Sequence, residues 1–538
     1  MTVPATASHP PSRYIATDPT VADGWRLERL TTPSRLFGAN GLRTGPDGRV
    51  YVAQVTGSQI SAVNLASSDV EAVSPKGSEI IAPDDVAFDS SGNLYATEVM
   101  DGRVSVRDAD GAARVLRDDL PCANGITVYQ DRLFVNECRD GGRLMELDRA
   151  TGAARILLED LASPNAMEVG PDGMLYYPLM TANEIWRIDP DPNKHSEPQR
   201  VTGDLGVPDA VKFDAQGYLV STQVASGQVL RIDPRTGDKT LLAQLNPGLD
   251  NLTFVGDRLF VSNFTGEITE ILASGETRTA LPGGLNWPLD LVVGEDGRLY
   301  VADGTYFYTV GTDGVLETVG MLFTPGYPGF LRGLAPAGAG AFVVATSGGQ
   351  IARYRPGDGE TDYLADGFDQ LYGVAIGPGD SIVFAELGTG SVHALRSGNV
   401  ELLASGLQDP VGVTFGSDGV PLVAESGAGR VVRLTGSTET VVDGLQRPQG
   451  IHVRDGQLYI VDAGAKEIVA VDLASGERHT VASGLPIGPP PGVNPKPLKG
   501  MPPFSGPQGP FAGITSGSDG SLYVSADGDG SVLALRRT

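Results

Sequence analysis

The sequence predicts an all-β fold of two tandem β-propellers, each a six-bladed ring of four-stranded blades. A unit of about 40 residues recurs twelve times along the 538-residue chain. Each copy holds a short apolar strand, a Gly/Asp turn and a second apolar strand, as in "DDVAFDSSGNLYATEV". No segment shows sustained helical periodicity. A period near 40 with only strand and turn signals is typical of propeller blades.

The remaining strands of a blade follow each hairpin. Third strands read "GRLMELD" and "GQVLRIDP", and fourth strands read "ARILLE" and "KTLLAQ". The tags "DRATG" and "DPRTG" between them are turns in which Gly supplies a positive φ. The sequence therefore predicts a four-stranded meander for each unit.

Twelve blades exceed the four to eight that one ring usually holds. We expect an N-terminal arm at residues 1–23, a first propeller at 24–275 and a second propeller at 276–538. The spare strand Gly24–Leu30 is expected to complete the sixth blade, and Glu276–Leu281 to complete the twelfth. A single twelve-bladed ring is the alternative that strand counting does not exclude.

One interval between repeats is longer than the others. Its excess, Leu485–Pro510, is rich in Pro and Gly and has no strand signal. It precedes an inner strand, so it belongs to the face where loops lead into the inner strands. Two interpretations stay open, a tolerated surface insertion or a lid over the second channel.

The net charge and the composition limit the kinds of partner and the location that we expect for this protein. The formal net charge is −26, which disfavours nucleic acid and anionic membranes. The chain has no apolar run long enough to span a membrane, and its first residues lack the pattern of a signal peptide. We expect a cytoplasmic protein with a small-molecule substrate, and the sequence does not indicate an oligomeric state. The two cysteines, Cys122 and Cys138, are expected to be free thiols.

The residue that leads into each inner strand points toward the channel of a propeller, so six such residues converge in each ring. We call these the column residues. In the first ring they are all Asn or Asp, whereas those of the second ring are mixed. The first set is Asn40, Asp84, Asn124, Asn165, Asp209 and Asp250, and the second is Leu289, Arg332, Tyr372, Val411, Gln449 and Ala512.

Oxygen ligands converging at one mouth suit a hard cation such as Ca²⁺, which takes six to eight of them. The alternative is that Asn and Asp only cap their own turns. That alternative does not explain why the second half, with the same turns, lacks them. The sequence therefore predicts a divalent cation, Ca²⁺ or a similar ion, in the first channel.

Three motifs in consecutive blades, "CANGITV", "SPNAMEV" and "VPDAVKF", resemble the SMP-30/gluconolactonase-like superfamily, which includes enzymes of the paraoxonase and diisopropylfluorophosphatase type. The resemblance implies a six-bladed propeller with a divalent cation, usually Ca²⁺, held by Glu, Asn, Asn and Asp. The matching positions are Asn124, Asn165 and Asp209. Asn40 stands in the place of the early Glu, so the expected metal ligands are Asn40, Asn124, Asn165 and Asp209.

The resemblance implies a metal-dependent hydrolase of the lactonase or esterase type, with Asp209, Asp84 or Glu137 as base or nucleophile. Glu137, and Glu98 one blade earlier, are expected near the channel mouth, although both also fit plain solvated loop carboxylates. Two alternatives stay open. One is a propeller lyase or condensing enzyme, possibly metal-free, with its site around Arg332 and Tyr372 and the acidic strand ends of the second ring. The other is a non-catalytic binding scaffold.

Overall fold

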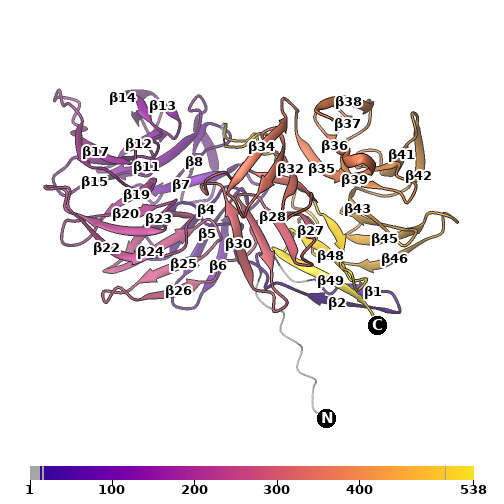
Figure 1. Cartoon of the computed structure of the whole chain (residues 1–538). Coiled ribbons are helices and arrows are strands. Elements are labelled where there is room, and N and C mark those ends of the chain that lie inside the picture. Colours follow the sequence, from indigo (N-terminus) through magenta and orange to yellow (C-terminus); the bar gives the residue numbers. More distant parts are fainter. Residues whose placement is uncertain (1–11, 15–16, 503) are drawn as a thin grey trace, which may run out of the picture. The chain divides into compact units, whose positions relative to one another are not determined.

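The structure is a computed structural model that describes residues 12–14, 17–502 and 504–538. It contains 49 β-strands arranged in twelve antiparallel sheets (Figure 1). Within the described residues the only helical element is the short 3-10 turn η1 (Pro378–Asp380), and no helix is long and apolar enough to cross a membrane. The predicted all-β class and the twelve repeats are confirmed.

The first propeller consists of six blades, and each blade is a meander of four consecutive strands. From the inner to the outer strand, the blades are β3 (Leu42–Thr44), β4 (Val50–Gln54), β5 (Gln59–Asn64), β6 (Asp69–Ser74); β7 (Pro83–Phe88), β8 (Leu94–Glu98), β9 (Arg103–Arg107), β10 (Ala113–Arg117); β11 (Ala123–Tyr129), β12 (Arg132–Glu137), β13 (Asp140–Leu147), β14 (Ala154–Ala162); β15 (Glu168–Val169), β16 (Leu175–Leu179), β17 (Glu184–Ile188), β18 (Gln199–Thr202); β19 (Pro208–Phe213), β20 (Leu219–Gln223), β21 (Gln228–Ile232), β22 (Lys239–Gln244); and β23 (Leu249–Val255), β24 (Arg258–Asn263), β25 (Ile268–Ile271), β26 (Thr277–Leu281).

The inner strands of these blades form a closed ring. Each contacts the next, from β3 through β7, β11, β15, β19 and β23, and β23 contacts β3 again. At the closure the Thr44 backbone N–H donates to Thr253 Oγ1 at 3.1 Å, and the Thr44 hydroxyl donates to the Phe254 carbonyl at 2.7 Å. This ring therefore holds six blades, as predicted, and it closes without a strand from elsewhere in the chain.

The second propeller repeats the plan with one difference in its last blades. The strands are β27 (Pro288–Val293), β28 (Leu299–Asp303), β29 (Tyr306–Val310), β30 (Leu316–Met321); β31 (Leu331–Pro336), β32 (Phe342–Thr346), β33 (Ile351–Arg355), β34 (Glu360–Ala365); β35 (Leu371–Ile376), β36 (Ile382–Glu386), β37 (Ser391–Arg396), β38 (Asn399–Ala404); β39 (Pro410–Phe415), β40 (Pro421–Glu425), β41 (Arg430–Leu434), β42 (Thr438–Val442); β43 (Pro448–Arg454), β44 (Gln457–Asp462), β45 (Glu467–Asp472), β46 (Arg478–Ser483) with β1 (Thr20–Val21) at its edge; and β47 (Ile514–Ser516), β48 (Leu522–Ala526), β49 (Ser531–Arg537) with β2 (Trp25–Arg29). Their inner strands close a second ring, in which β27 contacts β47.

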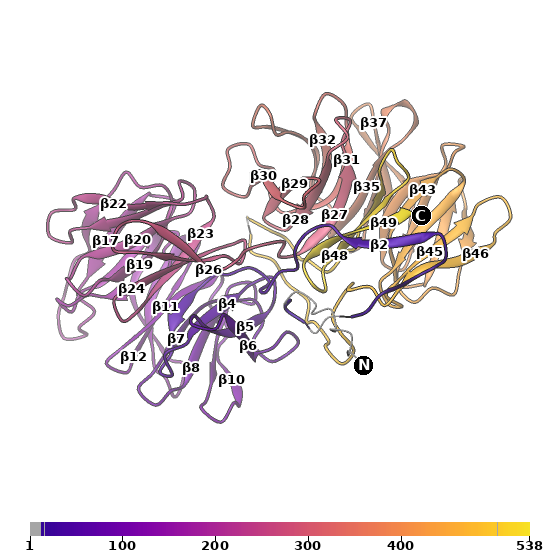
Figure 2. The same cartoon turned by 90° about the horizontal axis from the view of Figure 1, so that it is seen from below.

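The prediction of how the spare strands pair was wrong. Strand β2 pairs with β49, with Leu27 opposite Leu535, so the N-terminal strand completes the twelfth blade and not the sixth (Figure 2). Strand β26 stays in the sixth blade, paired with β25 through a tight turn at Gly275. A local hairpin closes a much shorter loop than an exchange between rings would, so its entropic cost is lower.

The compact units follow this pairing. One unit comprises residues 35–283 and 493–501, and the other comprises the described residues among 12–34, 284–492 and 502–538. The boundary expected at 275/276 lies after β26 instead, and the described residues of the expected arm, 12–14 and 17–23, group with the second propeller. The rest of that arm, residues 1–11 and 15–16, lies outside the described residues. The first propeller keeps β26, and residues from β1 onward that precede Arg35 belong to the unit of the second propeller.

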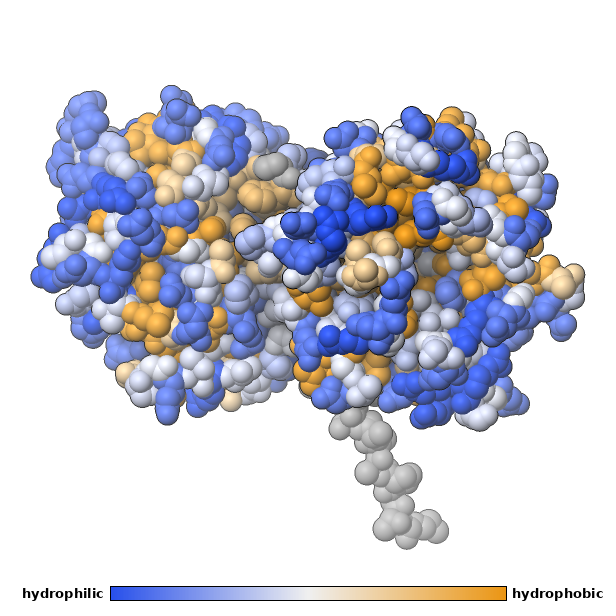
Figure 3. All heavy atoms as spheres, viewed as in Figure 1, coloured by the Kyte–Doolittle hydropathy of each residue, from blue (hydrophilic) through white to orange (hydrophobic). Residues whose placement is uncertain are grey.

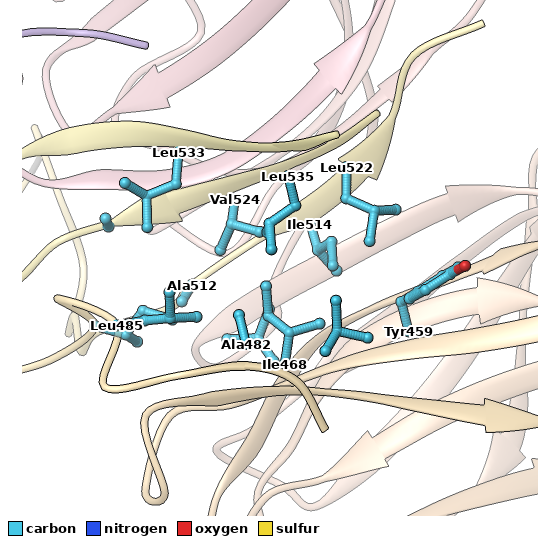
Figure 4. Packing of buried hydrophobic residues seen from close by; sticks show 14 of the residues in the cluster. Tyr459, Ile468, Ala482, Leu485, Ala512, Ile514, Leu522, Val524, Leu533 and Leu535 are labelled. Atoms are coloured by element: carbon cyan, nitrogen blue, oxygen red, sulfur yellow. The ribbon is translucent and has the colours of Figure 1, made fainter. Parts of the chain in front are cut away.

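Apolar side chains pack between adjacent blades. Figure 4 shows the cluster between the eleventh and twelfth blades, where Ile468 and Ala482 face Val524, Leu533 and Leu535. Trp25 from β2 joins the same cluster, so the terminal strand is held by burial as well as by its hydrogen bonds. Outside these cores, the face of the molecule in Figure 3 is mostly hydrophilic with smaller hydrophobic areas between.

Candidate functional site

The six column residues of the first propeller come together at one end of its channel. Five of them are buried, and Asn40 is half-buried. Asn40 Nδ2 donates to Asp250 Oδ2 at 2.9 Å, and Asn165 Nδ2 donates to Asp209 Oδ1 at 2.8 Å. Asp209 and Asp250 lie close enough that, besides burial, the charge of Asp209 raises the pKa of Asp250. The convergence expected from the repeat pattern is therefore present in the structure.

Three carboxylates in this ring are destabilised as anions. Burial raises the pKa of Asp84 well above its usual range, and the charges of Asp250 and Asp85 raise it further. Burial also raises the pKa of Asp209, with Asp84 adding to the effect. The pKa of Asp250 is raised by burial and then by Asp209. Like charges held together in a site of low dielectric favour protonation or a counter-cation.

A cation fits the chemistry of this ring. Asn124 Oδ1 is buried and has no hydrogen-bond partner, an uncommon state for a buried carbonyl oxygen. The amide oxygens of Asn40 and Asn165 each accept one backbone N–H, from Val55 and Ala166. Each keeps a second lone pair.

The carboxylates alone do not build a metal site. Across the described part of the chain, no group of three or more His, Cys, Asp and Glu side chains is arranged to hold a metal ion. An ion in this ring would therefore need the amide oxygens together with the carboxylates.

Glu98 and Glu137 are placed differently from the expectation. Both are fully buried, so neither is a solvated loop carboxylate. Glu137 pairs in register with Ala123, and its carboxylate is bound by Arg143 and by Arg139 at 3.2 Å. Glu98 accepts the Ile81 backbone N–H at 2.6 Å and binds Arg103. Their oxygens are engaged by arginines and backbone outside the ring of column residues.

The acidic ends of second strands have a repeated structural use. The side chain at this position accepts backbone N–H groups from the loop that leads into the inner strand of its own blade. The pairs are Gln54 with Phe37, Glu98 with Ile81, Gln223 with Gly206, Asp303 with Asn286 and Trp287, Glu386 with Asp369, Glu425 with Gln408, and Asp462 with Gln446 and Arg447. The acidic side chains Asp303, Glu386, Glu425 and Asp462 of the second ring therefore hold loops in place. The sequence analysis had suggested that these side chains line a pocket.

A second polar level of the first channel was missed by the sequence analysis. It lies three residues after the column residues, at Arg43, Glu168 and Lys212. Arg43 donates to the carbonyls of Val86 and Ile126, both at 3.0 Å, and its guanidinium lies 4.0 Å from Glu168. Reading each repeat three positions further along would have revealed these charges.

Lys212 is the unusual member of this level. Its side chain is buried, and Nζ has no hydrogen-bond partner. Burial lowers the pKa of Lys212 to about 8, and the nearby Arg43 contributes in the same direction. A buried amine of this kind is largely uncharged at mildly alkaline pH and can accept a proton.

The thiols are as predicted. Cys122 and Cys138 are both free and buried. Cys138 Sγ lies 3.5 Å from Met180 Sδ, behind Asn165. Burial raises the pKa of both thiols, so they are poor nucleophiles.

Comparison with known proteins gives a match for the first propeller. No curated protein matches the chain. Solved structures that resemble it include a streptogramin B lyase (18% identity, 52% of this chain, 94% of that one, TM-score 0.39) and virginiamycin B lyase from Staphylococcus aureus (16%, 55% and 98%, TM-score 0.39). A gluconolactonase from Xanthomonas campestris is a third (18%, 47% and 94%, TM-score 0.38). Residues 22–265 match the family described as SMP-30/Gluconolactonase/LRE-like region. This match confirms the resemblance seen in the three motifs, all of which lie within the matched residues.

Proposed function

We propose that the chain is a hydrolase of lactones or esters that works in the channel of its first propeller with a divalent cation. The single observation that carries this proposal is the ring of buried Asn and Asp side chains, in which Asp84, Asp209 and Asp250 share one low-dielectric mouth. The family match over residues 22–265 supports the enzyme class.

The residues proposed to hold the cation are Asn40, Asn124, Asn165 and Asp209, with Asp84 and Asp250 beside them. A bound Ca²⁺ or similar ion supplies Lewis acidity toward a carbonyl oxygen. Asn124 contributes an unpartnered oxygen. The hydrogen bond from Asn165 Nδ2 holds Asp209 in position.

Among the carboxylates, Asp84 is the best candidate for the general base. No hydrogen-bond donor to its side chain is found in the described structure, and a raised pKa brings a carboxylate closer to the working pH of a base. Asp209 is the second candidate. Glu137 is less suited because Arg139 and Arg143 already bind its carboxylate oxygens.

The test measures hydrolysis of D-glucono-1,5-lactone and phenyl acetate by pH-stat, using protein treated with chelator and then supplied with Ca²⁺, Mn²⁺ or Zn²⁺. We expect activity that depends on one of these ions. Asp84→Asn and Asp209→Asn should each lower kcat/KM at least 100-fold. The exposed Asp257→Asn, in the turn between β23 and β24, is the matched control and should leave the rate unchanged.

Binding of the ion is measured separately by thermal unfolding with and without added Ca²⁺. Asp209→Ala should reduce the Ca²⁺-dependent shift in Tm more than Asn165→Ala, because it removes a full charge. Absence of any ion-dependent shift in the parent protein would reject the metal site. Ion binding without turnover of either substrate would reject the hydrolase and favour a lyase or a binding scaffold.

A further inference from the structure

The channel end of the second propeller contains a buried arginine without an acidic partner. Arg332 is 1% exposed. Within the described residues no carboxylate forms a hydrogen bond or ion pair with it. Its only hydrogen bond to a backbone group runs from Nη2 to the Gly509 carbonyl at 2.5 Å, and Nη1 is buried without a partner. Since a guanidinium stays charged in proteins, this leaves a buried positive charge that its surroundings do not neutralise.

Aromatic rings enclose this guanidinium. Its central carbon lies 4.4 Å from the ring centre of Tyr372 and 5.4 Å from that of Trp287. Rings in these positions stabilise the cation and shield it from water. They leave the edge of the guanidinium, which carries the N–H donors, as the part that can bind an anion.

Residues 506–511 cover this end of the channel, and we call them the cover segment. Gly506 and Gly509 approach so closely that an added Cβ would meet the Ser347 carbonyl at 2.1 Å and the Tyr372 hydroxyl at 2.7 Å. Phe511 packs against Tyr372, with ring centres 6.0 Å apart. The last residues of the insertion, 506–510, therefore lie where the lid interpretation expects them, whereas residues 493–501 group with the first propeller.

The cover segment carries a second unpartnered polar side chain. Gln508 is 3% exposed, and neither its amide oxygen nor its amide nitrogen has a hydrogen-bond partner. The side chain of Ser347, beneath Gly506, also has a buried hydroxyl without a partner. Unsatisfied donors and acceptors of this kind are costly unless a ligand completes them.

A cavity lies among the inner strands of this ring, although Arg332, Tyr372 and Gln508 are not among its lining residues. It has a volume of about 380 Å³ and is lined by the inner strands, with Phe511 among its walls. This volume is in the range of sites for small molecules. Its polar groups include Asp290 and the His452–Ser516 pair, whose side chains are 2.9 Å apart.

We propose that the second propeller binds a small organic carboxylate at Arg332, beneath the cover segment. The two oxygens of a carboxylate match the fork of a guanidinium. The site offers one positive charge, which matches a monoanion better than a phosphate dianion. In the structure the Gly509 carbonyl accepts a hydrogen bond from Nη2 of Arg332, so a bound carboxylate would take the place of that carbonyl. The side-chain amide of Gln508 would then offer one donor group and one acceptor to the rest of the ligand. This proposal does not depend on the hydrolase function of the first propeller.

The experiment is isothermal titration calorimetry of the full chain, in chelator and at low salt, with acetate, benzoate, D-gluconate and inorganic phosphate as probes. We expect at least one carboxylate to bind with a stoichiometry of one. Arg332→Gln and Arg332→Lys should each weaken binding at least tenfold, since a lysine cannot reproduce the fork. Gln508→Ala should weaken it threefold or more. The exposed Arg298→Gln in the same propeller is the matched control and should bind within twofold of the parent.

Two further measurements show whether the carboxylate binds in the second propeller and not in the first. Asp84→Asn and Asp209→Asn in the first propeller should leave carboxylate binding unchanged. In a Trp25→Phe, Trp186→Phe variant, the fluorescence of Trp287 should change on binding. The proposal is overturned if none of the three carboxylates binds with a Kd below 10 mM, if phosphate binds and they do not, or if both Arg332 variants fold and bind as well as the parent.

Discussion

At the scale of single residues, burial decides which charges matter in the first channel. Asp84, which is buried beside other carboxylates and has no cationic partner in the described structure, has a raised pKa, whereas two arginines bind the carboxylate of Glu137. Lys212 is the opposite case, a buried amine with a lowered pKa and no hydrogen-bond partner. Such residues cost stability, and natural proteins retain this cost most often at functional positions.

Lys212 gives a prediction about pH. Its folded pKa of about 8 lies below the ordinary value of 10.5, so between these values the unfolded chain binds more protons than the folded one. Stability of the first propeller should therefore rise as pH increases from about 8 to 10.5, and the full penalty is present below pH 8. Lys212→Met should remove that rise and stabilise the propeller at pH 7 by roughly 1–3 kcal/mol.

The measurement is urea unfolding across this pH range in a Trp25→Phe, Trp287→Phe background, where Trp186 reports on the first propeller alone. The exposed Lys239→Met serves as control and should keep the parental pH dependence. An unchanged slope in Lys212→Met would mean that the amine is charged and solvated in the folded state.

At the scale of elements, the second strand of a blade does more than pair with its neighbours. Its last side chain holds the loop that leads into the inner strand, as Glu425 does with the Gln408 N–H at 2.8 Å. The chain uses Gln for the same bond in other blades, at Gln54 and Gln223. The bond therefore depends on an acceptor oxygen, and the negative charge is dispensable for it.

This interpretation predicts different effects of two substitutions at one position. Glu425→Ala should destabilise the second propeller by about 1–3 kcal/mol, because it removes the acceptor of the Gln408 N–H and the partner of Arg430. Glu425→Gln should cost less than half of that, although it weakens the pairing with Arg430. Urea unfolding of a Trp186→Phe background, in which Trp25 and Trp287 report on the second propeller, provides the comparison. Equal losses in the two variants would show that charge pairing dominates.

Local pattern explains how much of this architecture the sequence predicted. The hairpins, the period and the Asn/Asp column depend on neighbours along the chain, and they are where the repeats place them. The direction of the Glu137 carboxylate depends on Arg139, which lies just before β13, and on Arg143 within β13. The pairing of β11 with β12 does not predict these contacts. The cover segment is similar, because no repeat predicts that Gly509 lies on Arg332, 177 residues away in sequence.

At the scale of the whole molecule, the two propellers close differently. The first ring is built from consecutive residues, from β3 to β26, and needs no terminal strand. The second ring joins both ends of the chain, since β2 pairs with β49 and Arg29 forms an ion pair with Asp529 at 2.8 Å. Strand counting alone could not decide this, because both arrangements fill all twelve blades with the same strands.

The difference predicts that removal of residues 1–30 affects only one propeller. Without β2, strand β49 becomes an exposed edge and the cluster around Trp25 loses a large aromatic side chain, which together should lower the stability of the second propeller by at least about 3 kcal/mol. The first propeller should unfold at the same urea concentration as in the full chain.

The fluorescence of Trp186 follows unfolding of the first propeller in a Trp25→Phe, Trp287→Phe background. The fluorescence of Trp287 follows unfolding of the second propeller in the truncated chain with Trp186→Phe. Leu27→Asp in the full chain is the point-mutation counterpart and should weaken the second propeller in the same direction. A parallel loss in both transitions would show that the two rings unfold as one cooperative unit, and closure of the twelfth blade would then stabilise the entire chain.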